Sequence, residues 1–458
     1  MEDLLANLKG FIWGTPLLAF LIGTGVFLTI ILRGMQFRYI GYAIKQAFAK
    51  SQESAEGDIS HFEALMTTLG GAIGTGAIVG VSTAITVGGV GALFWMWVTA
   101  IVGMATKYAE SLLAVKYRVA DKNGEMIGGP MEYIDRGLGW RWLALLFAAF
   151  GCLAAISTGN LVQVNSIVDS LTVHWSIDPL WIGAVVAVLV GLVIMGGVRS
   201  IGHVAGFLVP FMALFYVGGG LVIIGYHYEQ LPTAIAHIFI SAFRGDAAIG
   251  GFSGATVMMA IQMGVARSIF SNEAGLGISS IAAAAAKTDA PGRQAMIVMT
   301  GALLSTLVVC TITGLVIAVT GLVGTQGPSG ELLDGAALAI RAFESTIRGG
   351  GYVVTVGLVL FALSTIIAWA YYGEKCFEYL FGERAVLPFR CLFTLAIIPG
   401  ALMNMGTIWH IADISNGLMV IPNLIALIGL SGVIVTETRH FLAIVKRERG
   451  EKAEGAAL

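Results

Sequence analysis

Charged residues are scarce in this chain, and their scarcity excludes an ordinary soluble protein. Only 12% of its 458 residues are Asp, Glu, Lys or Arg, whereas a soluble domain carries about 25%. Hydrophobic residues make up 57% of the chain, and the mean hydropathy is +0.85. The composition therefore predicts a polytopic, all-α membrane protein.

Residues that build catalytic or metal centres are also few. The four cysteines, Cys152, Cys310, Cys376 and Cys391, show neither metal-ligand nor disulfide spacing, and we interpret them as small packing residues. The seven histidines form no His-Glu-x-x-His pair, and neither a Gly-x-Ser-x-Gly elbow nor a P-loop occurs. The formal net charge is -2, with no basic patch for nucleic acid. The pattern argues against an enzyme and against a nucleic-acid partner.

Long stretches without charge mark the predicted membrane spans. A charge at the centre of a membrane helix costs about 2.5 to 3.5 kcal/mol on insertion scales, so each uncharged stretch is a candidate. The long stretch 64–106 must hold two spans, divided at 88–91. The eleven predicted spans are 11–32, the two within 64–106, 142–168, 179–198, 200–228, 247–266, 294–330, 349–373, 391–412 and 414–436. We expect the first to be retained as a helix, because it is long enough to cross a bilayer.

The distribution of Lys and Arg predicts the orientation. With eleven spans and an external N-terminus, most of the 26 basic residues fall on the cytoplasmic side. The C-terminus is then cytoplasmic, and residues 438–458 are expected to form a short, basic, disordered tail near an anionic leaflet. The compact loops are typical of a prokaryotic inner membrane protein. No loop is long enough for a catalytic domain.

Two of these spans carry signs of a break. The run 70–77 is crowded with glycine at the middle of its span, where each Gly costs about 1 kcal/mol relative to Ala. The span 247–266 leads directly into the polar segment 267–277. One such segment could equally be a tight helix crossing. Two breaks five spans apart instead match secondary transporters, whose half-helix ends bind substrate and ion.

Other polar residues inside the spans admit two interpretations each. Asn160 and Gln163 share a helix face and could bind a solute or another helix. Ser364 and Thr365 could complete a cation site or bond to their own helix. Lys107 and Glu110 are explained more simply by a local ion pair or snorkelling than by a proton relay. Arg267 and Glu273 flank the second break and could gate a pathway or pin the helix.

At this point the residues are recognisable as a family pattern. The chain resembles the alanine/glycine:cation symporters, sodium-coupled carriers similar in fold to the leucine-transporter (LeuT-type) group. The resemblance rests on Gly74-Thr75-Gly76, Phe94-Trp95-Met96-Trp97, Lys107-Tyr108-Ala109-Glu110, Gly128-Gly129-Pro130-Met131, the run 267–277, Ala284-Ala285-Ala286-Lys287-Thr288, Trp369-Ala370-Tyr371-Tyr372-Gly373-Glu374 and Asp413-Ile414-Ser415-Asn416-Gly417.

The resemblance implies a single transporter domain over residues 1–458, built as a five-plus-five inverted repeat. An extra N-terminal helix, 11–32, would precede the first repeat at 62–228 and the second at 247–437. The discontinuous helices would be the second and seventh spans. That arrangement agrees with the eleven spans counted from the charges.

The resemblance also implies a site for a small zwitterion at the bilayer midplane. Its carboxylate would lie near the backbone of Thr75, Gly76 and Ala77. Its amine would lie near carbonyls of Ser268, Ile269, Phe270 and Ser271, and Gln163, Phe270 and Trp369 would close the pocket. One Na+, a co-transported ion and not a prosthetic group, would be held by the carbonyls of Gly70 and Ile73 and the hydroxyls of Ser364 and Thr365.

Three positions depart from the family pattern. Ala77 stands where the family has Asn, which removes an amide from beside the site. Gly89-Val90-Gly91 replaces Gly-Pro-Gly, and Met131-Glu132-Tyr133-Ile134 replaces Met-Tyr-Tyr-Ile in a cytoplasmic loop. The change at Ala77 bears on substrate identity, affinity and any second ion.

We therefore expect sodium-coupled symport of alanine, glycine or a similarly small amino acid by alternating access. The partners would be the amino acid, Na+ and the lipid bilayer, with no obligate protein partner. A passive channel or facilitator is one alternative, and it would need a continuous pore. A non-transporting sensor with the same fold is another, and a membrane enzyme comes last.

Overall fold

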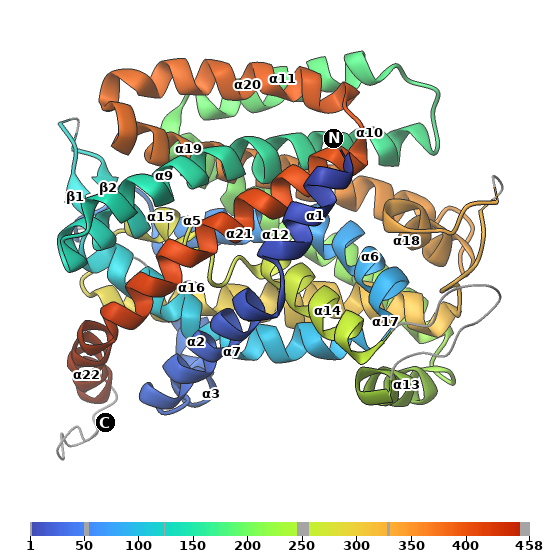
Figure 1. Cartoon of the computed structure of the whole chain (residues 1–458), viewed down its shortest axis with the longest axis horizontal. Coiled ribbons are helices and arrows are strands. Elements are labelled where there is room, and N and C mark those ends of the chain that lie inside the picture. Colours follow the sequence, from blue (N-terminus) through green and yellow to red (C-terminus); the bar gives the residue numbers. More distant parts are fainter. Residues whose placement is uncertain (1, 50–54, 123, 245–255, 328–329, 449–458) are drawn as a thin grey trace.

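The computed structural model describes residues 2–49, 55–122, 124–244, 256–327 and 330–448. Nearly all of these residues are helical. One small hairpin pairs β1 (Val119–Ala120) with β2 (Met126–Ile127) in antiparallel register, Val119 opposite Ile127. In Figure 1 most long helices run along one axis of the molecule. The hairpin and the last helix lie at one end of that axis, and α13 and α18 lie at the other.

The first half of the chain holds the N-terminal helices and the first broken span. Its helices are α1 (Glu2–Ile12), α2 (Thr15–Ile31), α3 (Met35–Arg38), α4 (Ile40–Ala47), α5 (His61–Ala72), the 3-10 turn η1 (Thr75–Ala77), α6 (Val79–Gly88), α7 (Ala92–Lys116), α8 (Pro130–Tyr133), the π-helix η2 (Ile134–Leu138), α9 (Arg141–Ile156), the π-helix η3 (Ser157–Leu161), α10 (Val162–Thr172), α11 (Pro179–Ile194) and α12 (Gly197–Tyr226).

The second half holds the second broken span. Its helices are α13 (Leu231–Arg244), α14 (Val257–Asn272), α15 (Ser280–Ala284), α16 (Pro291–Ala302), the π-helix η4 (Leu303–Cys310), α17 (Thr311–Thr320), α18 (Gly335–Glu344), α19 (Gly351–Phe381), the 3-10 turn η5 (Glu383–Ala385), α20 (Val386–Leu402), α21 (Met405–Gly429) and α22 (Ser431–Glu448).

The helices are those of a membrane protein. Among the described residues, eight helical segments are long and apolar enough to cross a bilayer, and shorter apolar helices accompany them. The long stretch 64–106 divides between Gly88 and Ala92, as its glycines predict. The count of eleven spans stays a prediction, because the criterion of length and apolarity leaves the short and broken helices undecided.

The charge-free criterion misplaced the boundary between the last two spans. We expected helices at 391–412 and 414–436, separated at Asp413. Instead α21 continues through Asp413, and the turn lies at Met403 and Asn404, where the Asn404 side chain accepts from the Gly406 amide. Asp413 is tolerated inside the helix because two basic side chains from other helices reach it.

Three other boundaries also differ from the prediction. Helix α1 precedes the expected start at residue 11, with a turn at Trp13 and Gly14 before α2. The span expected at 247–266 is helical from Val257, and residues 245–255 lie outside the described part. The tail expected to be disordered from residue 438 is helical to Glu448. Its apolar residues pack on the protein, with Phe441 and Val445 buried.

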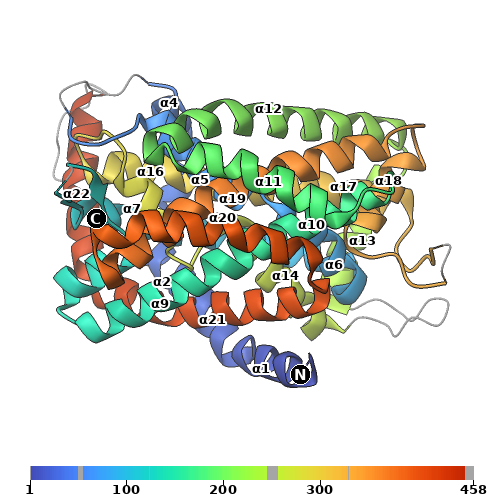
Figure 2. The ribbon, with the colours of Figure 1, turned by 90° about the horizontal axis from the view of Figure 1, so that it is seen from above.

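The core that positions the site is formed where the broken helices meet the continuous ones. α7 packs against α14 and α16, and α19 packs against α5, α9 and α12. Figure 2 shows α1 at one edge of the molecule, alongside α21, and the two helices are in contact. The two broken spans are therefore enclosed by the rest of the bundle.

Candidate functional site

The first broken helix interrupts its hydrogen bonds at the predicted place. A Ser60–Glu63 capping box begins α5, and the last α5 contact is the Ile73 amide donating to the Leu69 carbonyl at 2.6 Å. Gly74 is extended, η1 follows, and α6 begins at Val79. A Cβ at Gly74 would lie 2.5 Å from Thr365 Oγ1 and 3.0 Å from Gln163 Oε1. The break is confirmed, and only glycine fits at its centre.

The second break lies later than the sequence predicted. We placed it from Arg267, but α14 continues to Asn272, and the interruption runs from Glu273 to α15 at Ser280. Helix formation persists because the polar residues 267–272 are buried and have partners in the fold. The helix ends where Glu273 adopts a left-handed backbone with φ 59°, followed by Gly275 at φ 91° and Gly277 at φ 75°.

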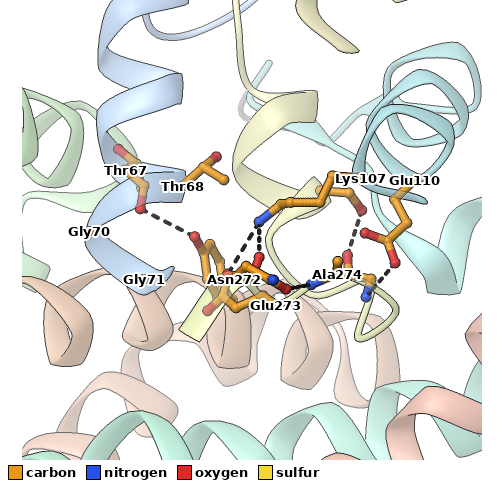
Figure 3. A network of polar contacts seen from close by, with 12 residues as sticks. Thr67, Thr68, Gly70, Gly71, Lys107, Glu110, Asn272, Glu273 and Ala274 are labelled. Atoms are coloured by element: carbon orange, nitrogen blue, oxygen red, sulfur yellow. Dashed lines mark hydrogen bonds and ion pairs between the residues drawn. The ribbon is translucent and has the colours of Figure 1, made fainter. Parts of the chain in front are cut away.

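Lys107 and Glu110 hold this second break from α7. Lys107 Nζ donates to the Asn272 carbonyl at 2.7 Å. Glu110 Oε1 accepts from the amides of Gly275 and Gly277 at 2.9 and 3.1 Å. Figure 3 shows both side chains reaching the same unwound segment. The expected local ion pair or snorkelling is wrong, because both side chains are fully buried and bind backbone groups of another helix.

Glu273 and Arg267 act at different places. Glu273 Oε2 lies 3.9 Å from Lys107 Nζ, and a Cβ at Gly71 would lie 3.2 Å from Glu273 Oε1. Its carboxylate therefore sits between the two breaks (Figure 3). Arg267 contacts Asp413 instead, with Nη1 and Nη2 at 3.4 and 3.3 Å from the two carboxylate oxygens. The two residues expected to flank the break thus have different partners, Lys107 for Glu273 and Asp413 for Arg267.

Arg267 also lies at the wall of a cavity. The cavity has a volume of about 620 Å³ and is lined by residues that include Lys9, Val79, Asp169, Arg267, Asp334 and Trp409. The Arg267 guanidinium lies 4.7 Å from the Trp409 ring centroid, and Trp409 lies 4.8 Å from Phe270, centroid to centroid.

Phe270 in turn packs against the first break, since a Cβ at Gly76 would lie 2.6 Å from its ring. Arg267, Trp409 and Phe270 thus form a layer between the cavity and Gly76. Sequence reasoning missed Trp409 and the role of Asp413. A lone charge in an apolar stretch was the available signal for Asp413.

Several predicted pocket residues meet around the first break. Gln163 Oε1 accepts from the Thr75 amide at 3.2 Å, and its Nε2 donates to the Thr158 carbonyl at 3.0 Å. Trp369 Nε1 donates to the Gly71 carbonyl at 3.4 Å. The Ala77 carbonyl accepts from Thr313 Oγ1 at 2.8 Å. Asn160, by contrast, donates to the Phe393 carbonyl at 2.6 Å and joins two helices.

The side chains of the predicted serines on α14 contact neighbouring helices. Ser268 Oγ donates to the Met96 carbonyl at 3.1 Å, and Ser271 Oγ lies 2.9 Å from Cys310 Sγ. The Ile269 carbonyl accepts from the Glu273 amide at 2.7 Å. The carbonyls of Phe270 and Ser271 lie in the last helical turn, where carbonyls have no partner within the helix.

The predicted sodium ligands Ser364 and Thr365 on α19 both contact the Gly70 carbonyl on α5, and the Ser364 hydroxyl also donates to the Phe361 carbonyl of its own helix at 2.8 Å. Thr365 Oγ1 donates to the carbonyls of Gly70 and Gly71 at 2.8 and 3.4 Å, and Ser364 Oγ to Gly70 at 3.3 Å. At Ile73 the backbone leaves the helical conformation, with ψ at 69°, so α5 ends just before the Ile73 carbonyl. The set consists of neutral oxygens, the ligand type that hard cations prefer.

Comparison with known proteins gives consistent matches over the whole chain. The model of a family described as the sodium:alanine symporter family matches residues 1–455. The sodium/alanine symporter AgcS of Methanococcus maripaludis is 50% identical, over 97% of this chain and 98% of its own. An uncharacterized transporter of Haemophilus influenzae is 51% identical, over 97% of each chain. The crystal structure of MhsT in complex with L-phenylalanine has a TM-score of 0.61 at 16% identity, covering 84% of this chain and 93% of that chain, which shows a shared fold.

Proposed function

Because the chain belongs to the sodium:alanine symporter family, we propose that it carries alanine or glycine together with Na+ by alternating access around its two broken helices. Like the members of its family, it is a multi-pass membrane transporter and not an enzyme. The observation that carries the proposal is the meeting of Gly74, Gln163 and Thr365 at the first break. There the substrate and ion positions share one segment of backbone.

The substrate carboxylate would bind at the start of η1 and α6. Amides at the start of a helix point at the bound anion, and the helix dipole favours negative charge there. Gly76 has no side chain that would keep a carboxylate from its amide, whereas the amides of Thr75 and Ala77 would first have to leave Gln163 Oε1 and the Gly74 carbonyl. The substrate ammonium would bind the carbonyls of Phe270 and Ser271. Both charged ends of one amino acid are then matched by the ends of two half-helices.

The substrate side chain would face a pocket that is closed by aromatic rings. Phe270 packs on Gly76, and Trp369 packs on Gly159, where a Cβ would collide with its ring. Both rings are buried. Such walls favour hydrogen or methyl as the side chain, which supports glycine or alanine over larger amino acids.

Sodium would bind beside this pocket at Gly70, Ile73, Ser364 and Thr365. Ion binding replaces the hydrogen bonds from Thr365 and Ser364 to Gly70, so the hydroxyl protons turn away and the oxygens become ligands. Because α5 and η1 are one continuous segment, an ion on Gly70 fixes the backbone that the substrate needs at Thr75. Each ligand then raises the affinity for the other.

The orientation proposed from the basic residues places the 620 Å³ cavity on the outer side. Lys9, Asp169 and Asp334, which line it, belong to segments predicted to lie outside. The Arg267–Asp413 pair would then be the outer gate, closed in this conformation. We also propose that residues 62–228 and 247–437 form the two inverted repeats. The protein would lie in a prokaryotic inner membrane.

Uptake into proteoliposomes tests the function directly. Radiolabelled alanine and glycine would be offered with an inward Na+ gradient, with K+ alone, and with a proton gradient. Accumulation above the external concentration that requires Na+ supports the proposal. Equilibration without accumulation would indicate a facilitator, and binding without flux would indicate a sensor.

A further inference from the structure

Asp413 binds two cations, and they come from different parts of the fold. Its Oδ2 lies 3.3 Å from Arg267 Nη2 and 3.0 Å from Lys9 Nζ. Arg267 belongs to the second broken helix, whereas Lys9 belongs to α1, which precedes both proposed repeats. The Asp413 and Arg267 side chains are only 7% and 5% exposed, whereas that of Lys9 is 24% exposed and lines the cavity.

Helix α1 is fastened to α21. The Trp13 indole donates to the Asp413 carbonyl at 2.8 Å. Ile12 and Trp13 also fill the space that a side chain at Gly417 would occupy. The last residues of α1 and the turn after it thus pack against the segment Asp413–Gly417. Lys9 must therefore stay with Asp413 when α14 moves.

Opening of the gate would leave the Asp413 carboxylate without Arg267, and Lys9 can compensate its charge. When α14 carries Arg267 away, a buried carboxylate loses a partner, and an uncompensated buried charge is strongly unfavourable. Trp409, which also contacts Arg267, lies on α21 together with Asp413, so both contacts to Arg267 break in the same movement. A second cation that does not move with the gate keeps Asp413 neutralised in both states.

We infer that Lys9 is a positioning residue for transport, a standing counter-ion that lowers the free energy of opening the Arg267–Asp413 gate. The inference rests on the proposed function of that pair as the outer gate. It assigns the N-terminal helix a part in the transport cycle: α1 presents Lys9 to Asp413 and holds it there. Without Lys9, Asp413 would depend on Arg267 alone and the closed state would gain population.

The test measures gate opening through a thiol on the inner side of the layer formed by Arg267, Trp409 and Phe270. Val162 on α10 packs with Phe270 in one buried cluster, is only 1% exposed and lies outside the cavity lining. A Val162→Cys variant, in the full chain with the four native cysteines replaced by serine, reports gate opening by its rate of reaction with a hydrophilic maleimide. The purified protein is labelled in detergent, in NaCl and in KCl.

Lys9→Met removes the charge with little change in volume, and Lys9→Arg keeps it. We expect labelling to slow about tenfold in Lys9→Met and to return in Lys9→Arg, a change equivalent to about 1.4 kcal/mol. Lys45→Met, which removes an exposed charge on α4, should have no effect. In an Asp413→Asn background the effect of Lys9→Met should vanish, because no carboxylate remains to neutralise.

Transport supplies the second readout. A smaller open population raises the apparent KM for external substrate by the same factor, so Lys9→Met should raise it about tenfold and Lys9→Arg should not. Unchanged or faster labelling in Lys9→Met would overturn the inference, and so would slow labelling that Lys9→Arg fails to restore. It would also be overturned if Lys9→Met slowed labelling equally in the Asp413→Asn background. Absence of Na+-driven uptake in the wild type would instead remove the proposed function, while labelling still decides the role of Lys9.

Discussion

Thr365 Oγ1 donates to the carbonyl oxygen of Gly70 at 2.8 Å, which joins the continuous helix α19 to the last full turn of the broken helix α5. The contact connects residues almost 300 positions apart, at the place where the proposed ion would sit. Thr365 and Trp369 donate to carbonyls that precede the break. Gln163 accepts from the Thr75 amide, which follows it. This geometry makes the proposed coupling of ion and substrate open to direct test.

The Thr365 hydroxyl is the simplest part of the ion site to remove. Thr365→Val keeps the shape and loses the oxygen, so we expect the Na+ concentration for half-maximal uptake to rise about tenfold, the loss of about 1.4 kcal/mol that one ligand supplies. Thr365→Ser should retain near-normal activation. Uptake as a function of Na+ at saturating alanine measures both. Equal Na+ activation in the valine variant would exclude Thr365 from the site.

Lys107 is expected to be essential because it neutralises a buried carboxylate. Lys107→Met leaves Glu273 without its cation in a fully buried position, and breaking such a pair costs about 3 to 5 kcal/mol. The melting temperature in detergent should fall steeply. The double variant Lys107→Met with Glu273→Gln should be less destabilised than Lys107→Met alone. Additive losses in the two single variants would show that the charges do not interact.

Gly74 is expected to tolerate no side chain. A methyl group there would lie 2.5 Å from Thr365 Oγ1 and 3.0 Å from Gln163 Oε1, so Gly74→Ala must displace both. We expect Na+ and substrate affinity to fall together, by at least tenfold in uptake assays. Gly23→Ala on α2 is the matched control, because nothing lies within 4 Å of the added atom. A change in only one of the two affinities would contradict a shared backbone segment.

The first break could be predicted from the sequence, and the second only in part. Four glycines within seven residues, at 70, 71, 74 and 76, destabilise a helix through local energetics alone, so the segment itself indicates the position of that break. At the second break the local signal was misleading. Residues such as Ser268 and Asn272 look like helix breakers, yet they are satisfied by partners on α7 and η4, which no local pattern reveals.

The same reason explains the error at Asp413. An isolated carboxylate is expelled from an apolar helix, but Asp413 is stabilised by Arg267 and Lys9, 146 and about 400 residues away in sequence. Its position in a recognisable motif indicated importance without indicating a partner. Conversely, Lys107 and Glu110 are three residues apart on one helix face, from which we predicted a local ion pair or snorkelling. Their contacts with the backbone from Asn272 onward come from tertiary packing, which this local spacing does not reveal.

The contact of the C-terminal helix α22 with α16 and α4 is expected to weaken in acid. Glu448 accepts from Arg293 Nη2 at 2.5 Å and from the Tyr42 hydroxyl at 2.8 Å, which ties α22 to α16 and α4. The hydrogen bond from Arg293 lowers the pKa of Glu448 below its ordinary value of 4.5. A carboxyl group with a lowered pKa stabilises the fold fully above its unfolded value, and this stabilisation is lost as the pH falls through the folded value. The contribution should therefore be constant near neutral pH and be lost progressively as the pH falls below 4.5, the ordinary pKa of the group.

Melting temperatures of the wild type and of Glu448→Gln, compared from pH 7 to pH 3, measure this contribution. The glutamine variant lacks the ionisable group, so it should melt lower near neutral pH and approach the wild type as the pH falls. Acid effects on all other groups are common to both proteins and cancel in the difference. A difference that stays constant over this range would mean that Glu448 acts through packing or neutral hydrogen bonds, and that its pairing with Arg293 does not hold α22 in place.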